Sequence, residues 1–325
     1  MNSTTLQSTS WNEARSVHLG LNRIDDRVYR GLLPELRAAE QDALEMRTLA
    51  DSLGCTTRLL TSEEATLETV IATFESTIER LVPGDFLLIT YSGHGTTFRG
   101  LGDDPDGWDE GWCLYDGVLV DDELHDLLAT IPQGVDVLTV TDACFAAGIT
   151  DVGRAAPAVT PSTRPSQPVP APTALLREIA GPMMMVKAPF TRLGDLEIGR
   201  LLRSGQIPTA RAERIPERRP IQARLVSMAA AAEGSLAFEG DQLGYFTAAL
   251  LMILHRIGDD EVEYGELMDE IASLLTIQQP TLAVIGGDFD VITSTRAFKQ
   301  GSAVATKKEL RGQGLGLLKA ETENR

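Results

Sequence analysis

The chain has 325 residues and a formal net charge of −18, and 43% of its residues are hydrophobic. An apolar fraction of this size excludes wholesale disorder, and the length suits one large domain or two smaller ones. The acidity argues against nucleic acid or an anionic membrane as the main partner and favours a cationic one, a basic peptide or a metal ion. Three cysteines, no secretory signal and no apolar run near the roughly 20 residues of a membrane span lead us to expect a cytoplasmic protein.

Strand and helix signals alternate through the first half of the chain. Buried strands are predicted at 16–22, 57–60, 86–91 and 135–141, and helices at 36–53 and from the Thr61–Glu64 capping box to about residue 81. Between the last two strands, residues 101–126 hold ten acids and no Lys or Arg. A hairpin is expected there, with strands 112–115 and 118–120 joined across Asp116-Gly117.

The second half begins with a change in composition. Residues 157–172 contain six of the 16 prolines, which predicts an extended linker. Strands at 224–230 and 281–285 and helices at 245–255 and 263–275 follow, and the tail after about residue 302 is expected to be loosely ordered. The alternation as a whole predicts an α/β fold, in which helices cover both faces of a mostly parallel sheet.

His94 and Cys144 each come just after a predicted buried strand. In such sheets the chemistry gathers at the carboxyl ends of the strands, so neighbouring strands would bring the two side chains to one edge. A histidine beside a cysteine can activate a thiolate nucleophile and protonate a leaving amine. The N–H groups of Gly95 and Cys144 would form an oxyanion hole. The alternative is that Cys144 is a small core residue and His94 a hydrogen-bonded loop histidine.

Two segments, Tyr91-Ser-Gly-His-Gly95 and Asp142-Ala-Cys144, resemble the His and Cys motifs of the caspase-like cysteine peptidases, above all the metacaspases and their bacterial relatives, the orthocaspases. Gly244-Tyr-Phe-Thr247 is similar to a G-x-F-T stretch of the same family. One departure is that Phe-Ala-Ala follows Cys144 where metacaspases usually have His-Ser. The resemblance implies a caspase-like fold with a large-subunit-like part at 15–152, a basic insert at 153–222 and a small-subunit-like part at 223–300. An extension, 1–14, and a tail, 301–325, flank them.

The resemblance also implies an acidic pocket for the Arg or Lys that precedes the cleaved bond. Asp42, Ser92 and Asp142 match its residues. Physical chemistry supports such a pocket, because a planar guanidinium is best held by carboxylates in a partly desolvated site. The alternative for Asp42 is an ordinary exposed acid on a helix.

A calcium site is the third implication of the resemblance. The matching ligands are Asp109, Asp121, Asp122 and Asp151. Carboxylate oxygens from several loops suit Ca²⁺, which takes six to eight oxygens in flexible geometry. The alternative is a solvated acidic loop.

The basic insert is a candidate substrate for the enzyme itself. Residues 151–224 hold 12 Arg and Lys against six Asp and Glu in a chain that is acidic overall. We expect a monomeric zymogen in which calcium orders the acidic loops and the enzyme cuts this stretch after Arg154, Arg164, Arg177, Lys187 or Arg192. Alternatively, the insert packs on an acidic face. Two alternatives remain for the function of the whole chain. It is either an inactive caspase-like scaffold that binds a partner, or a related protease with another specificity.

Overall fold

The computed structural model describes residues 11–99, 108–144, 174–182, 185–188, 192–210, 219–232, 235–258 and 260–298. Its centre is a six-stranded sheet with the strand order β11-β9-β7-β3-β1-β2. Five strands are parallel, and only β11 runs antiparallel to its neighbour. Their bounds are β1 Ala14–Gly20, β2 Thr56–Thr61, β3 Phe86–Ser92, β7 Asp136–Asp142, β9 Arg224–Ala229 and β11 Thr281–Ile285. The predicted mostly parallel sheet is confirmed.

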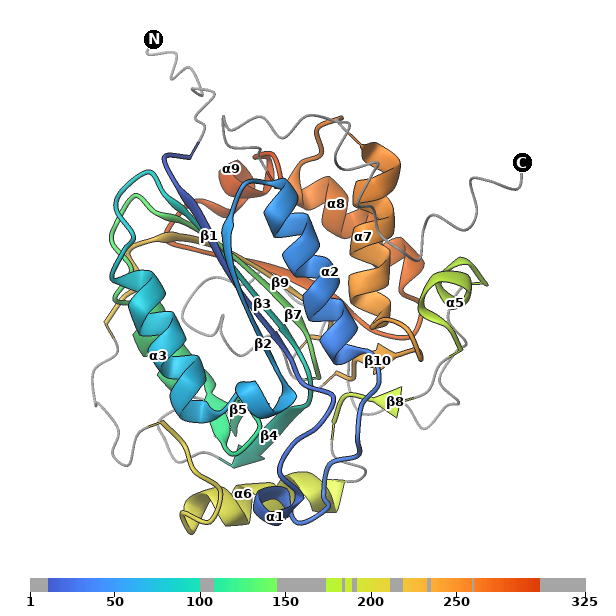
Figure 1. The fold of residues 1–325 in the computed structure, drawn as a ribbon. Coiled ribbons are helices and arrows are strands. Elements are labelled where there is room, and N and C mark those ends of the chain that lie inside the picture. The colour runs from blue at the N-terminus through green and yellow to red at the C-terminus, as the bar shows by residue number, and fades with distance from the viewer. Residues whose placement is uncertain are drawn as a thin grey trace.

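Helices cover both faces of this sheet (Figure 1). Helices α2 (Ala39–Ser52), α7 (Tyr245–Ile257) and α8 (Tyr264–Leu274) share one apolar cluster with Leu88 and Leu138 of the sheet. Helices α3 (Leu67–Ile78) and α4 (Asp121–Leu128) share another with Leu87 and Ile89. Since neighbouring residues of a strand point to opposite faces, the continuous apolar run of β3 serves both cores.

A smaller antiparallel sheet lies beside the carboxyl ends of the central strands. It consists of β4 (Gly95–Arg99), β5 (Trp108–Cys113) and β6 (Val118–Val120). Leu114 N donates to Gly117 O at 2.8 Å, which closes the predicted hairpin between β5 and β6. Phe98 of β4 belongs to an apolar cluster with α1 (Asp26–Tyr29) and α6 (Arg192–Arg203).

Several elements differ from the prediction. The capping box forms a short 3-10 turn, Ser62–Glu64, and helix α3 begins later, after Thr66, whose side chain accepts a hydrogen bond from Thr69 N. Helix α4 was not predicted. Neither was the order in the described part of the insert, which contains α5 (Ala174–Ala180), β8 (Met185–Val186) and α6.

The remaining described elements are short. Strand β10 (Phe238–Glu239) pairs with β8, Glu239 forms an isolated bridge with Gly244, and helix α9 spans Phe289–Thr293. The predicted linker at 157–172 and the tail at 301–325 lie outside the described residues. Among the residues described, no helix has the length and hydropathy that crossing a membrane requires.

Candidate active site

His94 and Cys144 lie at the same edge of the central sheet. Strands β3 and β7 are parallel neighbours, and their last paired residues are Ser92 and Asp142. His94 and Cys144 each come two residues after this pair, and each side chain is only 1% exposed. The two strands are therefore neighbours, as the sequence analysis required for the two side chains to meet.

The two glycines of the His94 motif are needed for close packing. Tyr91 Oη donates to the carbonyl of His94 at 2.7 Å, and a Cβ on Gly93 would lie 2.6 Å from that hydroxyl. A Cβ on Gly95 would lie 1.8 Å from the carbonyl oxygen of Cys144. A side chain at either position would push apart the loops that carry the histidine and the cysteine.

The imidazole of His94 is oriented by a backbone carbonyl. Its Nε2 lies 2.7 Å from Pro34 O, which only accepts, so Nε2 carries the proton. In the described part of the chain Nδ1 makes no hydrogen bond of good geometry, which leaves it available as a base. An interaction with the backbone of Lys187 raises the pKa of the ring against the effect of burial. Burial lowers the pKa of His94 to about 4 and raises the pKa of Cys144 to about 12. Both groups are therefore neutral in this state. Sequence reasoning missed Pro34, because a backbone carbonyl has no signature.

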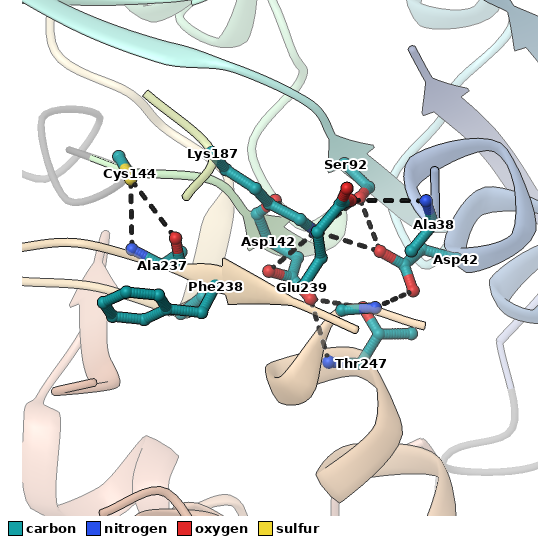
Figure 2. A network of polar contacts seen from close by, with 12 residues as sticks. Ala38, Asp42, Ser92, Asp142, Cys144, Lys187, Ala237, Phe238, Glu239 and Thr247 are labelled. Carbon is teal, nitrogen blue, oxygen red and sulfur yellow. Dashed lines mark hydrogen bonds and ion pairs between the residues drawn. The ribbon is translucent and has the colours of Figure 1, made fainter. Parts of the chain in front are cut away.

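Cys144 faces the segment that leads into β10. Ala237 N donates to Sγ at 3.1 Å, and Sγ lies 3.5 Å from Ala237 O (Figure 2). The segment that contains Ala237 thus forms one wall beside the thiol.

Asp42, Ser92 and Asp142 surround the ammonium group of Lys187 (Figure 2). Lys187 Nζ lies 3.0 Å from Asp42 Oδ2, 2.9 Å from Ser92 Oγ and 3.0 Å from Asp142 Oδ1, and it donates to Asp142 O at 3.1 Å. All four side chains are buried. The residues that the resemblance grouped do come together, and they do so around a lysine of the insert.

The carboxylates of this pocket are held by the start of helix α7. Gly244 N donates to Asp42 Oδ1 at 2.8 Å. Thr247 donates to Asp142 Oδ2 through its backbone N at 3.0 Å and its hydroxyl at 2.8 Å. Ser92 Oγ donates to Asp42 Oδ2 at 2.6 Å. The G-x-x-T stretch therefore positions both acids.

Gly244 also makes room for the cation. Its φ of −63° and ψ of 143° suit any residue, so conformation does not require a glycine. A Cβ there would lie 2.6 Å from Lys187 Nζ, 2.7 Å from Asp42 Oδ2 and 2.2 Å from Asp142 Oδ2. A side chain at this position would fill the pocket.

Glu239 is a third buried acid close to the pocket, and the sequence analysis did not single it out. Its carboxylate accepts from Arg37 N at 2.8 Å and Ala38 N at 3.3 Å, which ties β10 to the start of α2. Burial raises the pKa of Glu239 to about 7 and that of Asp42 to about 6, in both cases against the opposing effect of Lys187. Burial alone would lower the pKa of Lys187, but the surrounding carboxylates raise it above its ordinary value. The lysine is therefore a cation.

The backbone of Lys187 is held on both sides. Its N–H donates to Ala237 O at 3.0 Å, and its carbonyl oxygen accepts from Gly95 N at 3.1 Å. The preceding strand β8 pairs antiparallel with β10, Val186 opposite Phe238. Lys187 thus lies at a bend directly after β8, with its carbonyl on one of the two predicted oxyanion-hole donors.

The other predicted cleavage points are placed differently. Arg177 lies exposed within helix α5, and Arg192 is the first residue of helix α6. Both positions would have to unwind to enter an active site as an extended strand. Arg154 and Arg164 lie outside the described residues.

The predicted calcium ligands are only partly described. Asp109 lies in β5, and Asp121 and Asp122 begin helix α4, while Asp151 lies outside the described residues. Within the described ranges, no three His, Cys, Asp or Glu side chains form a group suited to a metal ion. The three described carboxylates therefore do not form a calcium site by themselves.

We compared the chain with known protein families and structures. The profile of the caspase domain family, Peptidase_C14, matches residues 24–301. The chain belongs to this family. Membership supports a cysteine-type peptidase, as the sequence predicted, and the His94 and Cys144 positions lie within the matched range.

Individual relatives agree with the family match. Metacaspase-1 of Arabidopsis thaliana is 36% identical over 81 residues, 23% of this chain and 22% of that protein. Metacaspase-4 of the same plant is 28% identical over 154 residues, 43% of this chain and 35% of the relative. The chain thus spans about a fifth to a third of the length of these two proteins. A solved structure, protein GSU0716 of Geobacter sulfurreducens, is 25% identical with a TM-score of 0.67, covering 89% of this chain and 99% of that one.

Proposed function

We propose that this chain is a caspase-like cysteine endopeptidase that cleaves after Lys or Arg, and that its first substrate is its own Lys187–Ala188 bond. One observation carries the proposal: Lys187 has its ammonium between Asp42 and Asp142 and its carbonyl oxygen on Gly95 N–H. A bound substrate residue would make these same contacts.

The cleavage step follows from the groups around this bond. Cys144 Sγ attacks the carbonyl carbon of Lys187 while His94 Nδ1 takes the thiol proton, and Gly95 N–H stabilises the oxyanion. The C–N bond breaks as the imidazolium returns that proton to the nitrogen of Ala188. Water then hydrolyses the thioester, which restores the thiol and leaves a carboxyl group on Lys187. Because thiol and imidazole both start neutral, proton transfer accompanies attack and no ion pair precedes it.

The burial of Lys187 supports the proposal that it occupies a substrate pocket. A buried ion pair seldom stabilises a fold more than apolar side chains of the same volume would, because desolvation of the charges offsets their attraction. A lysine that is 0% exposed among three buried acids is therefore better explained as the occupant of a cation pocket than as a stabilising contact.

Peptide hydrolysis tests the specificity. The wild-type chain is incubated with fluorogenic peptides that end in Lys, Arg or Asp, and Cys144→Ala is the control. We expect release from the Lys and Arg peptides only, and none from the variant. Equal turnover of the Asp peptide would contradict the pocket assignment.

Calcium dependence is a separate proposal, which rests on the acidic residues of 101–126 and on the resemblance. The same assay with calcium or with EDTA tests it: EDTA should suppress hydrolysis and calcium restore it. Unchanged hydrolysis rates in EDTA would contradict calcium dependence but would not affect the peptidase proposal.

The scaffold alternative has one observation in its favour, since the protein's own Lys187 fills the proposed pocket. A scaffold would keep this arrangement and cut nothing. Purified chain that remains intact, and that hydrolyses no Lys or Arg peptide with or without calcium, would favour this alternative.

A further inference from the structure

We infer that the site selects for an apolar residue before the cleaved Lys and a small residue after it, so that Met-Val-Lys-Ala represents its preferred class of substrate. This inference rests on the proposed function, because it takes the segment around Lys187 as the substrate in place. It extends the specificity beyond the cation pocket.

The residue before the lysine packs against the protein core. Val186 stands opposite Phe238 in the β8–β10 pair, and it is partly buried against the apolar cluster that contains both Phe238 and Cys144. Lys187, at the bend that follows β8, reaches into the acidic pocket. Val186 instead packs against the apolar cluster, where a charged side chain would be desolvated without a partner.

The residue after the lysine is enclosed. Ala188 is 2% exposed and belongs to the same apolar cluster as Cys144 and Ala237. A close-packed environment tolerates added volume poorly, because extra methylene groups force neighbouring side chains and backbone to move. A large side chain at this position would displace the bond that Cys144 must attack.

The main chain fixes this register. Lys187 N–H donates to Ala237 O and Gly95 N–H donates to Lys187 O, one bond on each side of the lysine Cα. With both bonds made, a peptide cannot slide to bring a different neighbour into either subsite. Backbone contacts of this kind bind an extended peptide, and the side-chain subsites then discriminate among sequences.

The test uses four internally quenched peptides and the full chain carrying Lys187→Ala, whose own segment no longer fills the cation pocket. The parent peptide contains Met-Val-Lys-Ala. One relative replaces Val by Asp, one replaces Ala by Phe, and one replaces Lys by Asp. We expect kcat/KM to fall at least tenfold for each of the first two relatives and below detection for the third.

A binding measurement keeps the inference testable if nothing is cut. In the full chain with Cys144→Ala and Lys187→Ala, the parent peptide should bind at least tenfold more tightly than the Asp and Phe relatives. Binding in this order, together with no hydrolysis of the Lys and Arg peptides by the wild-type chain, would reject the peptidase and retain the subsites. If the parent and both relatives are cut or bound equally while the Lys-to-Asp peptide is rejected, the inference is overturned and the cation pocket stands.

Discussion

The chain has two acidic regions, and their carboxylates are arranged differently. Asp42, Asp142 and Glu239 come from α2, β7 and β10, far apart in sequence, and each accepts hydrogen bonds from backbone N–H groups. The acids of the second region, Asp109 and the Asp121-Asp122 pair, come from adjacent segments, yet in the described part of the chain they form no metal-binding group. The acids that the described structure brings together around one cation are therefore the ones far apart in sequence.

The largest expected effect is the loss of one carboxylate from the pocket. Asp42→Asn keeps the shape but removes the charge 3.0 Å from the bound ammonium. Breaking a buried ion pair costs about 3–5 kcal/mol, so kcat/KM for a Lys peptide should fall by about two to four orders of magnitude. Asp51→Asn, on the exposed side of the same helix, is the control and should leave kcat/KM unchanged. If Asp42→Asn and Asp51→Asn lower kcat/KM equally, the buried carboxylate of Asp42 has no special role in binding the substrate lysine.

Filling the space at Gly244 should have the next largest effect. Gly244→Ala places a Cβ where the ammonium lies, and we expect kcat/KM for Lys peptides to fall about 10- to 100-fold, mainly through KM. Gly205→Ala is the matched control, because Gly205 has a φ of +67° with nothing within 4 Å of its Cβ position. That variant should lower the thermal unfolding temperature through backbone strain and leave KM unchanged. An unchanged KM in Gly244→Ala would show that the space at Gly244 does not limit the binding of the substrate lysine.

Acid pH should weaken the binding of Lys substrates. Burial raises the pKa of Asp42 to about 6, against the opposing effect of Lys187. Because only the carboxylate balances a cation, KM should fall as pH rises through this range, by about tenfold between pH 5 and 7. Initial rates against pH measure this, and Asp42→Asn should flatten the profile. The same slope in Asp42→Asn would assign the titration to another group.

The smallest expected effect concerns the support of Asp142. Thr247→Val removes the hydroxyl that donates to Asp142 Oδ2 but keeps the backbone donor. The loss of one such hydrogen bond should raise KM for Lys peptides about three- to tenfold. Thr247→Ser restores the hydroxyl and should restore KM. If Thr247→Ser behaves as Thr247→Val does, the effect comes from packing and not from the hydrogen bond.

Much of the fold follows from local sequence patterns. The apolar runs that end at Ser92 and Asp142 are central strands, and the turn residues that follow them place His94 and Cys144 at one edge. The family resemblance grouped Asp42 and Asp142, which periodicity alone does not connect. Helix boundaries were less accurate, because the Thr61–Glu64 capping box caps a 3-10 turn instead of α3.

Sequence reasoning named Lys187 as one of five candidate cleavage points but did not single it out as the residue that fills the pocket. Lysine is almost never fully buried unless it is paired, and the acids that bury Lys187 are brought to it from more than 40 residues away in either direction. Glu239 was missed for a similar reason, since it lies in a two-residue strand with no periodic pattern around it. Such groups become visible only when the packing of distant segments is known.

Determination of the N-termini produced by the purified 325-residue chain tests whether the enzyme cuts its own Lys187–Ala188 bond. We predict one early cut that leaves Ala188 as a new N-terminus, at a rate independent of protein concentration because the proposed substrate and active site belong to one chain. Cys144→Ala and Lys187→Gln should both prevent this cut, while Arg177→Gln should not. A first cut elsewhere in the wild-type chain, or a cut after Lys187 in Cys144→Ala, would rule out self-cleavage of this bond by Cys144.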